Sequence, residues 1–367
     1  IFDEPTTALD VTTQIEVLAA IRDVVRKHGA AAIYITHDLA VVAQMADRVK
    51  VLLKGEEVEE APTARMLAAP EKDYTRSLWA VRSFRPTPRQ TAETPDPILS
   101  LRNVTGGYGT HMVLDDVSFS VPRGRTVAVV GESGSGKSTT ARAIMGLLPL
   151  AKGQVVFDGE KLTGEGGHRQ RDLHRRMQMI HQMADTALNP RHRIRDVIGR
   201  PLEFFLGLKG AAKERRIRGL LDQIELDPAR FIDRLPGELS GGQKQRVSIA
   251  RALAAEPDFI ICDEVTSALD QLVAEGILRL LDRLQRELGL SYLFITHDLA
   301  TVRSIADEVV VMQNGKVVEQ GPKDRMFTPP HHPYTDKLLS SVPGMDPNWL
   351  TRLLSQRTAT VKELKQC

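Results

Sequence analysis

The sequence predicts an α/β fold with a mostly parallel sheet, and three observations lead to this prediction. First, short apolar runs alternate with helical patterns in the second half of the 367 residues, as in strand–helix–strand units. Second, the apolar run 126–130 enters a glycine-rich loop, and residues 140–148 leave it with a helical pattern. Third, an apolar strand predicted at 259–264 ends in the acids Asp263 and Glu264. Functional groups at the carboxyl ends of strands are typical of such folds.

An internal repeat divides the chain into two related copies. The Asp-Glu pair at 3–4 recurs at 263–264, and the Thr-His-Asp-Leu-Ala run at 36–40 recurs at 296–300, so the offset is 263 − 3 = 260 in both cases. A constant offset indicates two copies of one module. The first copy has no counterpart of the glycine-rich loop. We therefore expect the sequence to be a fragment or to have a misassigned start; a deliberately short regulatory half is the alternative.

The boundaries of the parts follow from composition. Four prolines among polar residues at 86–97 predict an extended linker. The region from about 184 to 254 shows no clear strand pattern and predicts a helical subdomain. We expect four parts, namely the C-terminal part of a first module at 1–85, the linker at 86–97, a complete second module at 98–327 and a C-terminal extension at 328–367.

The end of that extension has its own pattern. Residues 346–367 predict an amphipathic helix around four apolar side chains, Trp349, Leu350, Leu353 and Leu354. The sequence assigns this helix no role, and packing is the favoured function.

Composition excludes several classes of protein. The formal net charge of +2 gives no overall field that would attract nucleic acid. Two cysteines, Cys262 and Cys367, do not make a disulfide framework, and a reducing compartment suits them. No apolar run approaches the roughly 18 to 20 residues that span a bilayer. If the protein serves a membrane, we expect a partner to supply the span.

The glycine-rich loop carries the pattern G-x-x-x-x-G-K-[ST] between a predicted strand and a predicted helix. Its backbone N–H groups and the positive end of the helix are suited to cradle a phosphate chain. Lys137 is expected to reach the β- and γ-phosphates, and the Ser138 hydroxyl to ligate Mg²⁺. The sequence therefore predicts a nucleoside triphosphate site made of Gly131, Glu132, Ser133, Gly134, Ser135, Gly136, Lys137, Ser138 and Thr139.

Two further segments complete this expectation. At the end of its strand, Asp263 is expected to hold Mg²⁺ and Glu264 to polarise the attacking water. A Leu-Ser-Gly-Gly-Gln run precedes another predicted helix, which Ser240 can cap. The N–H groups at that helix end predict a second phosphate-binding surface, formed by Ser240, Gly241, Gly242 and Gln243.

The Leu-Ser-Gly-Gly-Gln run resembles the signature of the ATP-binding cassette (ABC) ATPases, and the second copy has that family's motifs in order. The resemblance implies a P-loop cassette with a mostly parallel sheet, N-terminal antiparallel strands and a helical subdomain, using ATP and Mg²⁺. It also implies that Tyr108 stacks on adenine. Gln182 would contact Mg²⁺ or water and link the site to a membrane partner, and His297 would contact the γ-phosphate. His181 departs from the family pattern, which usually has an aromatic residue there.

The C-terminal extension narrows the resemblance. Its segment 330–335, Pro-His-His-Pro-Tyr-Thr, and the segment 187–191 are similar to the oligopeptide, dipeptide and nickel importers. This implies an ATP-hydrolysing subunit that powers uptake of peptides, nickel or a similar small solute. It would sit on the cytoplasmic face of the inner membrane with two transmembrane permease subunits and a periplasmic solute-binding protein, and without nucleic acid. Some relatives carry an iron–sulfur cluster there, which needs about four thiolates and so does not suit two cysteines.

Two other interpretations stay open. A soluble ABC ATPase in translation or DNA repair is the main alternative, which the short proline-rich linker and the importer-like extension disfavour. A non-functional gene remnant is the other, although the second copy has lost no motif. The solute and the oligomeric state are not predicted.

The resemblance also predicts how turnover depends on a second cassette. In the family, each ATP lies between the phosphate loop of one cassette and the signature of another. The loop at 131–139 and the signature at 240–243 belong to the same copy here. We therefore expect the chain alone to bind ATP at one site but to hydrolyse it poorly. Turnover would return with a second cassette, supplied in cis by the missing N-terminal part or in trans by another chain.

Overall fold

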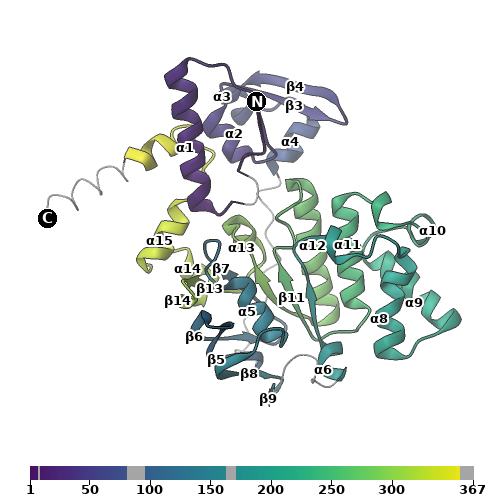
Figure 1. Cartoon of the computed structure of the whole chain (residues 1–367). Helices are drawn as coiled ribbons and strands as arrows, with labels where there is room; N and C mark the ends of the chain where they lie inside the picture. Colours follow the sequence, from purple (N-terminus) through teal and green to yellow (C-terminus); the bar gives the residue numbers. More distant parts are fainter. Residues whose placement is uncertain (7–8, 81–95, 163–170, 356–367) are drawn as a thin grey trace. The chain divides into compact units, whose positions relative to one another are not determined.

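The computed structural model describes residues 1–6, 9–80, 96–162 and 171–355, which form two compact units (Figure 1). Among the described residues, unit 1 comprises 1–6, 9–80, 270–272 and 333–355, and unit 2 comprises 96–162, 171–269 and 273–332. The predicted linker falls mostly outside the described residues. Its last residue, Pro97, already belongs to a strand of unit 2.

The central sheet of unit 2 has six strands in the order β10-β11-β12-β7-β13-β14. The first five are parallel, and β14 pairs with β13 in the antiparallel sense. This confirms the predicted mostly parallel sheet. β7, β11 and β12 are buried along their whole length, as expected for strands covered on both faces. The strand bounds are β7 Thr126–Val130, β10 Met177–Ile180, β11 Phe259–Asp263, β12 Ser291–Ile295, β13 Glu308–Gln313 and β14 Lys316–Pro322.

A second, antiparallel sheet has the strand order β6-β5-β8-β9. Two of its strands precede the phosphate loop in sequence, and the other two follow it. Its strands β5 and β6 lie N-terminal to the loop, which confirms the antiparallel strands implied by the family resemblance. One apolar cluster joins both sheets, since Leu99 and Phe157 pack in the same core as Val127 and Phe259. The strand bounds are β5 Pro97–Tyr108, β6 His111–Pro122, β8 Leu150–Phe157 and β9 Glu160–Lys161.

Helices make up the region between β10 and β11, as the sequence predicted. They lie together on one side of the central sheet, in teal and green (Figure 1). Among the described residues, no strand lies between 184 and 254. The helix bounds are α7 Ala184–Ala187, α8 Ile194–Leu206, α9 Gly210–Gln223, α10 Pro228–Phe231 and α11 Gly241–Leu253. A short helix, α6 Arg171–Arg176, precedes β10.

Two predicted boundaries were wrong by a few residues. The helix after the phosphate loop, α5, spans Lys137–Ile144 rather than 140–148. It starts early because Gly136, at φ 106°, turns the chain directly into the helix, and it ends before Gly146, at φ 72°. Strand β11 ends at Asp263, and Glu264 takes a left-handed conformation at φ 50°. The two acids contact different partners, Ser138 for Asp263 and Gln182 for Glu264.

Unit 1 contains the elements that follow its own Asp-Glu pair. A short parallel pair, β1 Phe2–Asp3 and β2 Tyr34–Ile35, is followed by the hairpin of β3 Arg48–Leu53 and β4 Glu56–Pro62. The hairpin has a register shift between Val51 and Leu52, and the β13–β14 hairpin has one between Val311 and Met312. The offset of 260 thus holds even for this irregularity. The helices of unit 1 are α1 Val11–His28, α2 Leu39–Met45, α3 Thr63–Ala68, α4 Asp73–Ala80 and α15 Pro333–Ser340.

The amphipathic helix predicted at 346–367 is confirmed from residue 349 to 355, whereas residues 346–348 form a turn and 356–367 lie outside the described residues. Residues 349–355 are helical. Leu350 and Leu353 are buried in a cluster with α1 and α2, and Trp349 and Leu354 pack against it. No helix in the described parts of the chain is both long and apolar enough to cross a bilayer.

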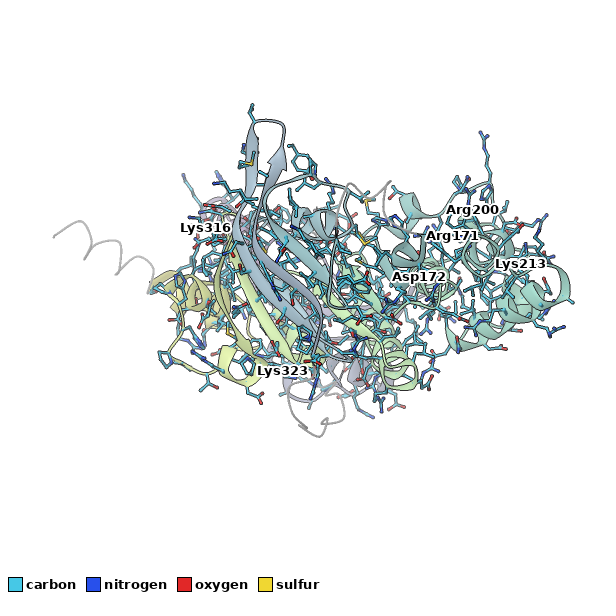
Figure 2. The ribbon with its side chains drawn as sticks, turned by 90° about the horizontal axis from the view of Figure 1, so that it is seen from below. Arg171, Asp172, Arg200, Lys213, Lys316 and Lys323 are labelled. Carbon is cyan, nitrogen blue, oxygen red and sulfur yellow. The ribbon has the colours of Figure 1, made fainter. Side chains whose placement is uncertain are left out.

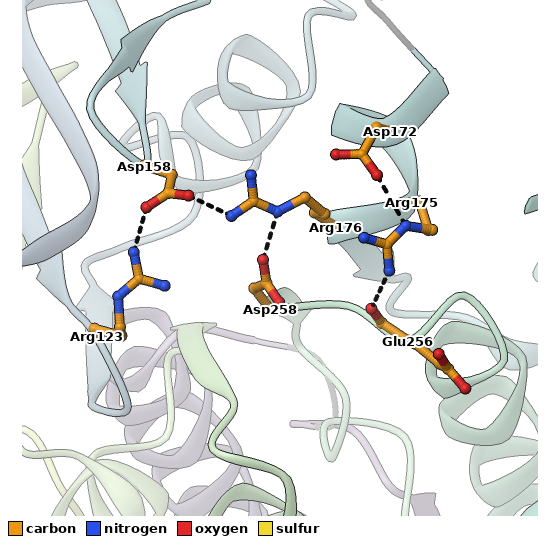
Figure 3. Close-up of polar contacts among 7 residues, drawn as sticks. All are labelled: Arg123, Asp158, Asp172, Arg175, Arg176, Glu256 and Asp258. Carbon is orange, nitrogen blue, oxygen red and sulfur yellow. Dashed lines mark hydrogen bonds and ion pairs between the residues drawn. The ribbon is translucent and has the colours of Figure 1, made fainter.

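An ionic network ties together the amino ends of β10 and β11 (Figure 3). The Arg176 guanidinium donates to Asp258, at 2.5 Å, and to Asp158, which also accepts from Arg123. Arg175 donates to the carbonyl oxygen of Glu256 at 2.9 Å. Hydrogen bonding to Arg176 lowers the pKa of Asp158, against the opposing effect of partial burial. The network fixes these strands at the end opposite to the one that carries the predicted site.

Candidate nucleotide-binding site

The phosphate loop lies between the buried strand β7 and helix α5. Three of its glycines have positive φ angles, Gly131 at 153°, Gly134 at 79° and Gly136 at 106°. A Cβ on Gly131 would lie 2.2 Å from the Met312 carbonyl oxygen on the neighbouring strand β13. The sheet therefore requires glycine at the first position of the loop, both for conformation and for space.

Lys137 holds the loop closed from inside. Its side chain is buried, and its Nζ donates to the carbonyl oxygens of Gly131 and Glu132, at 2.8 Å each. The Ser135 Oγ is buried close by and has no hydrogen-bond partner among the described residues. Because a buried hydroxyl without a partner is costly, this atom indicates a polar ligand in the loop. The loop thus fits a phosphate group.

Ser138 and Asp263 form the pair predicted to hold Mg²⁺. The Ser138 Oγ donates to Asp263 Oδ1 at 3.2 Å, which joins the first turn of α5 to the end of β11. Burial, assisted by the neighbouring Glu264 charge, raises the pKa of Asp263 against the opposing effects of Ser138 and Lys137. A buried carboxylate gains most from a cation beside it, and hydroxyl and carboxylate oxygens are the ligands that Mg²⁺ prefers. The donor set fits this ion.

Glu264 is the centre of a three-residue cluster. Gln182 Nε2 donates to Glu264 Oε2 at 2.6 Å, and His297 Nδ1 lies 3.3 Å from Glu264 Oε1. Burial alone would raise the pKa of Glu264, but the hydrogen bond and charge of His297, with the charge of Lys137, outweigh it and lower this pKa. Glu264 is therefore kept ionised, as a general base must be. The structure brings together all three residues that the sequence nominated as catalytic.

Tyr108 lies at the end of β5, at the edge of the site. The residue is 44% exposed, and its hydroxyl accepts a hydrogen bond from Arg142 NH1 of α5 at 2.8 Å. Sequence reasoning missed Arg142, which holds Tyr108 against the helix that follows the phosphate loop. Only the position of Arg142 on that helix could have suggested it. The exposed ring face is compatible with stacking on a base.

The signature segment opens helix α11. Ser240 is the N-cap, and its Oγ accepts from Gln243 N at 3.4 Å, while Gln243 Oε1 accepts from Ser240 N at 3.0 Å. This capping box confirms the predicted cap. A Cβ on Gly242 would lie 2.3 Å from Val273 Cγ1, so close packing against the next helix, α12 Gln271–Leu288, requires this glycine.

Two contacts that the sequence did not suggest connect α11 to the segment after Gln182. Lys244 forms an ion pair with Asp185 at 2.5 Å, and Arg251 NH1 donates to the Ala187 carbonyl oxygen at 2.5 Å. The signature helix and the Gln182 segment are thus mechanically joined. Burial, together with the charges of Arg251 and Arg142, lowers the pKa of His181, the residue before Gln182.

Comparisons with known proteins agree with this geometry. Residues 114–267 match the family described as "ABC transporter", and residues 318–367 match "Oligopeptide/dipeptide transporter, C-terminal region". The chain is 40% identical to the glutathione import ATP-binding protein of Pectobacterium atrosepticum, over 95% of this chain and 62% of that protein. The Escherichia coli K12 protein of the same name is 38% identical, with the same coverage. The chain thus spans about three fifths of the length of these curated relatives.

Two solved structures are similar over nearly their whole length. A dimeric ATP-binding cassette in a post-hydrolysis state with ADP and Pi has a TM-score of 0.54 and 31% identity, over 61% of this chain and 98% of that one. A subunit of a transporter complex from Clostridium perfringens has a TM-score of 0.57 and 25% identity, over 74% of this chain and 100% of that one.

Proposed function

Since the chain belongs to the ATP-binding cassette family of transporter ATPases, we propose that it binds ATP with Mg²⁺ in unit 2 and hydrolyses it to power an importer. One observation carries the proposal of hydrolysis. Gln182, Glu264 and His297 come from three separate segments and meet around one ionised carboxylate. That carboxylate directly follows Asp263, which is hydrogen-bonded to the phosphate-loop serine.

The residues divide the work by position. The loop N–H groups, Lys137 and Ser135 bind the phosphates, and Ser138 with Asp263 would hold Mg²⁺, which neutralises charge on the phosphates. Glu264 accepts a proton from the attacking water or orients it. His297 keeps Glu264 ionised and faces the same water, and Gln182 fixes the other carboxylate oxygen. Tyr108 is proposed to stack on adenine.

We infer that the importer takes peptides or a similar small solute. The match of the C-terminal region to oligopeptide and dipeptide transporters supports this class, and the relatives named for glutathione import support a short peptide. The proposed partners are two transmembrane permease subunits, a periplasmic solute-binding protein and a second cassette, with the chain on the cytoplasmic face of the membrane. The comparisons favour this over a soluble ATPase in translation or DNA repair.

A groove beside β10 is the surface we propose for a permease helix. It has a volume of about 400 Å³ and is lined by Met145, Arg171, His174, Met177, Gln178, Phe204 and Phe205. Phe204 is 56% exposed, and the Arg171 guanidinium lies 4.5 Å from the centre of its ring. Figure 2 shows Arg171, Arg200 and Lys213 over the helical side of unit 2, away from Lys316 and Lys323. Since β10 leads directly to Gln182, a helix in this groove would contact the strand that enters the site.

Nucleotide binding and turnover by the purified chain test the proposal. We expect saturable binding of a fluorescent ATP analogue that Lys137→Ala abolishes, with slow phosphate release that rises when a second cassette is supplied. Binding that is unaffected by Lys137→Ala would contradict the site. Rapid phosphate release that is independent of chain concentration would contradict the need for a second cassette. Uptake of a labelled short peptide by cells with the permeases, lost in a Glu264→Gln strain, tests the importer assignment.

A further inference from the structure

The C-terminal segment of the chain is held by one buried side chain of the first copy. Gln44, at the end of α2, is 8% exposed. Its Nε2 donates to the carbonyl oxygens of Gly344 and Asp346, at 2.7 Å each, and its Oε1 accepts from the Leu350 backbone N–H at 3.0 Å. Both donors of the amide and its acceptor are thus used by one segment 300 or more residues away in sequence.

Apolar contacts and one further hydrogen bond complete this docking. Leu350 and Leu353 are buried together with three residues of α1 and α2, Ile15, Leu18 and Val41. Arg22 NH1 of α1 donates to the Thr351 hydroxyl oxygen at 3.0 Å. A Cβ on Gly344 would lie 3.3 Å from the Trp349 ring, so the turn before the helix is also tightly packed. We call residues 344–354 the tail segment.

The second copy does not offer the same face. With the offset of 260, Leu18 corresponds to another leucine, Leu278. The other four contacting residues named above correspond to different chemistry, namely Glu275 for Ile15, Asp282 for Arg22, Thr301 for Val41 and Ser304 for Gln44. Glu275 is ion-paired with Arg279, and the Ser304 Oγ donates to the Thr301 carbonyl oxygen at 2.7 Å.

A charged face of this kind cannot receive the tail segment. Glu275 and Asp282 are paired with Arg279 and Arg286. Leucines packed on these ion pairs would take their charged groups further out of water without adding a hydrogen bond, which is costly. A serine also cannot reach two carbonyl oxygens and an N–H at once. The two copies, similar in fold, therefore differ at four of the positions that the tail segment contacts.

We propose that the tail segment is a recognition element, which binds the α1–α2 face of the first copy in its own chain and is excluded from the corresponding face of the second copy. The tail segment follows the second copy in sequence and binds the first copy, so it links one copy of each kind. Two second copies from different chains would have no such link between them. The contacts that carry this proposal lie outside the nucleotide site and do not rest on the proposed transport function.

Hydrogen–deuterium exchange of the full chain tests the proposal. In the native protein, peptides covering 344–355 should be protected, because the Leu350 N–H is bonded to a buried amide. The double variant Val41→Thr/Gln44→Ser gives the first copy the residues of the second, which the same fold tolerates there. We expect exchange in 344–355 to become at least tenfold faster, while α1 keeps its protection. The matched control is Val24→Leu, which also introduces a second-copy residue, at a position that is 55% exposed.

A second variant covers the possibility that the double variant disturbs the first copy. Leu350→Asp changes only the tail segment and should release it in the same way. Unchanged protection of 344–355 in both variants would overturn the proposal, as would a native tail that exchanges freely. Protection that disappears on dilution would mean binding between chains and would overturn the intrachain form.

Discussion

Replacing Glu264 by glutamine separates the chemical role of this residue from its structural role. The substitution keeps the size of the side chain and one acceptor oxygen. Gln182 Nε2 lies 2.6 Å from one carboxylate oxygen, so the new carbonyl oxygen can face it. The new amide nitrogen would then face His297 Nδ1, which lies 3.3 Å from the other oxygen and can accept in one tautomer. The cluster should therefore stay assembled while its base is lost.

The expected effect follows from this arrangement. Loss of a positioned general base costs about 10²- to 10⁴-fold in rate, which corresponds to about 3–5 kcal/mol of barrier. ATP affinity should change by only a few fold, because Lys137, Ser138 and Asp263 remain. The assay is single-turnover phosphate release in the assembled complex with permeases and a second cassette, with nucleotide affinity measured on the same sample.

A matched control is Glu287→Gln, the same chemical change at a half-exposed glutamate of α12. It should leave phosphate release unchanged. A rate within threefold of the native protein in Glu264→Gln would refute the role of Glu264 as base. Equal loss of rate and of nucleotide affinity would show instead that the residue maintains the site, and would also refute the reasoning.

Three further predictions follow from other contacts. Because His297 lowers the pKa of Glu264, His297→Ala should raise that pKa and move the acidic limb of the pH–rate profile to higher pH; an unmoved limb would contradict this. Gly131→Ala should abolish nucleotide binding but not folding of the helical subdomain, as measured by nucleotide titration and exchange protection. Arg176→Met should lower the free energy of unfolding by about 1–2 kcal/mol at neutral pH in urea titrations, after allowance for the partly exposed partners. The loss should shrink as acid protonates Asp158, whose folded pKa is lowered, and a pH-independent loss would argue against the ion pair.

The local sequence was sufficient for elements whose signals are short-range. β7 and the phosphate loop were predictable because a buried strand, three glycines with positive φ and a lysine follow one another within a few residues. The helix cap at Ser240 was predictable for the same reason, since its partner Gln243 lies three residues away. These signals depend only on residues that are neighbours in sequence.

Contacts that depend on the order of strands were not predictable in this way. The pairing of Gln182 with Glu264 requires β10 to lie beside β11, and the contact of Arg142 with Tyr108 requires the antiparallel sheet to reach α5. The tail segment is the extreme case. Its apolar pattern predicted an amphipathic helix. Nothing near it in sequence identified Gln44 as its partner, because Gln44 belongs to another helix about 300 residues earlier in the chain.

Unit 1 is built from segments that the ribosome synthesises at very different times. Residues of α1 and α2 emerge before unit 2, whereas α15 and the tail segment emerge after it. Ile15, Leu18 and Val41 stay without their covering leucines until the last part of the described chain has been made. A nascent chain that stops before the tail segment would present this apolar face to chaperones and proteases, so synthesis of the tail segment becomes a condition for burying it.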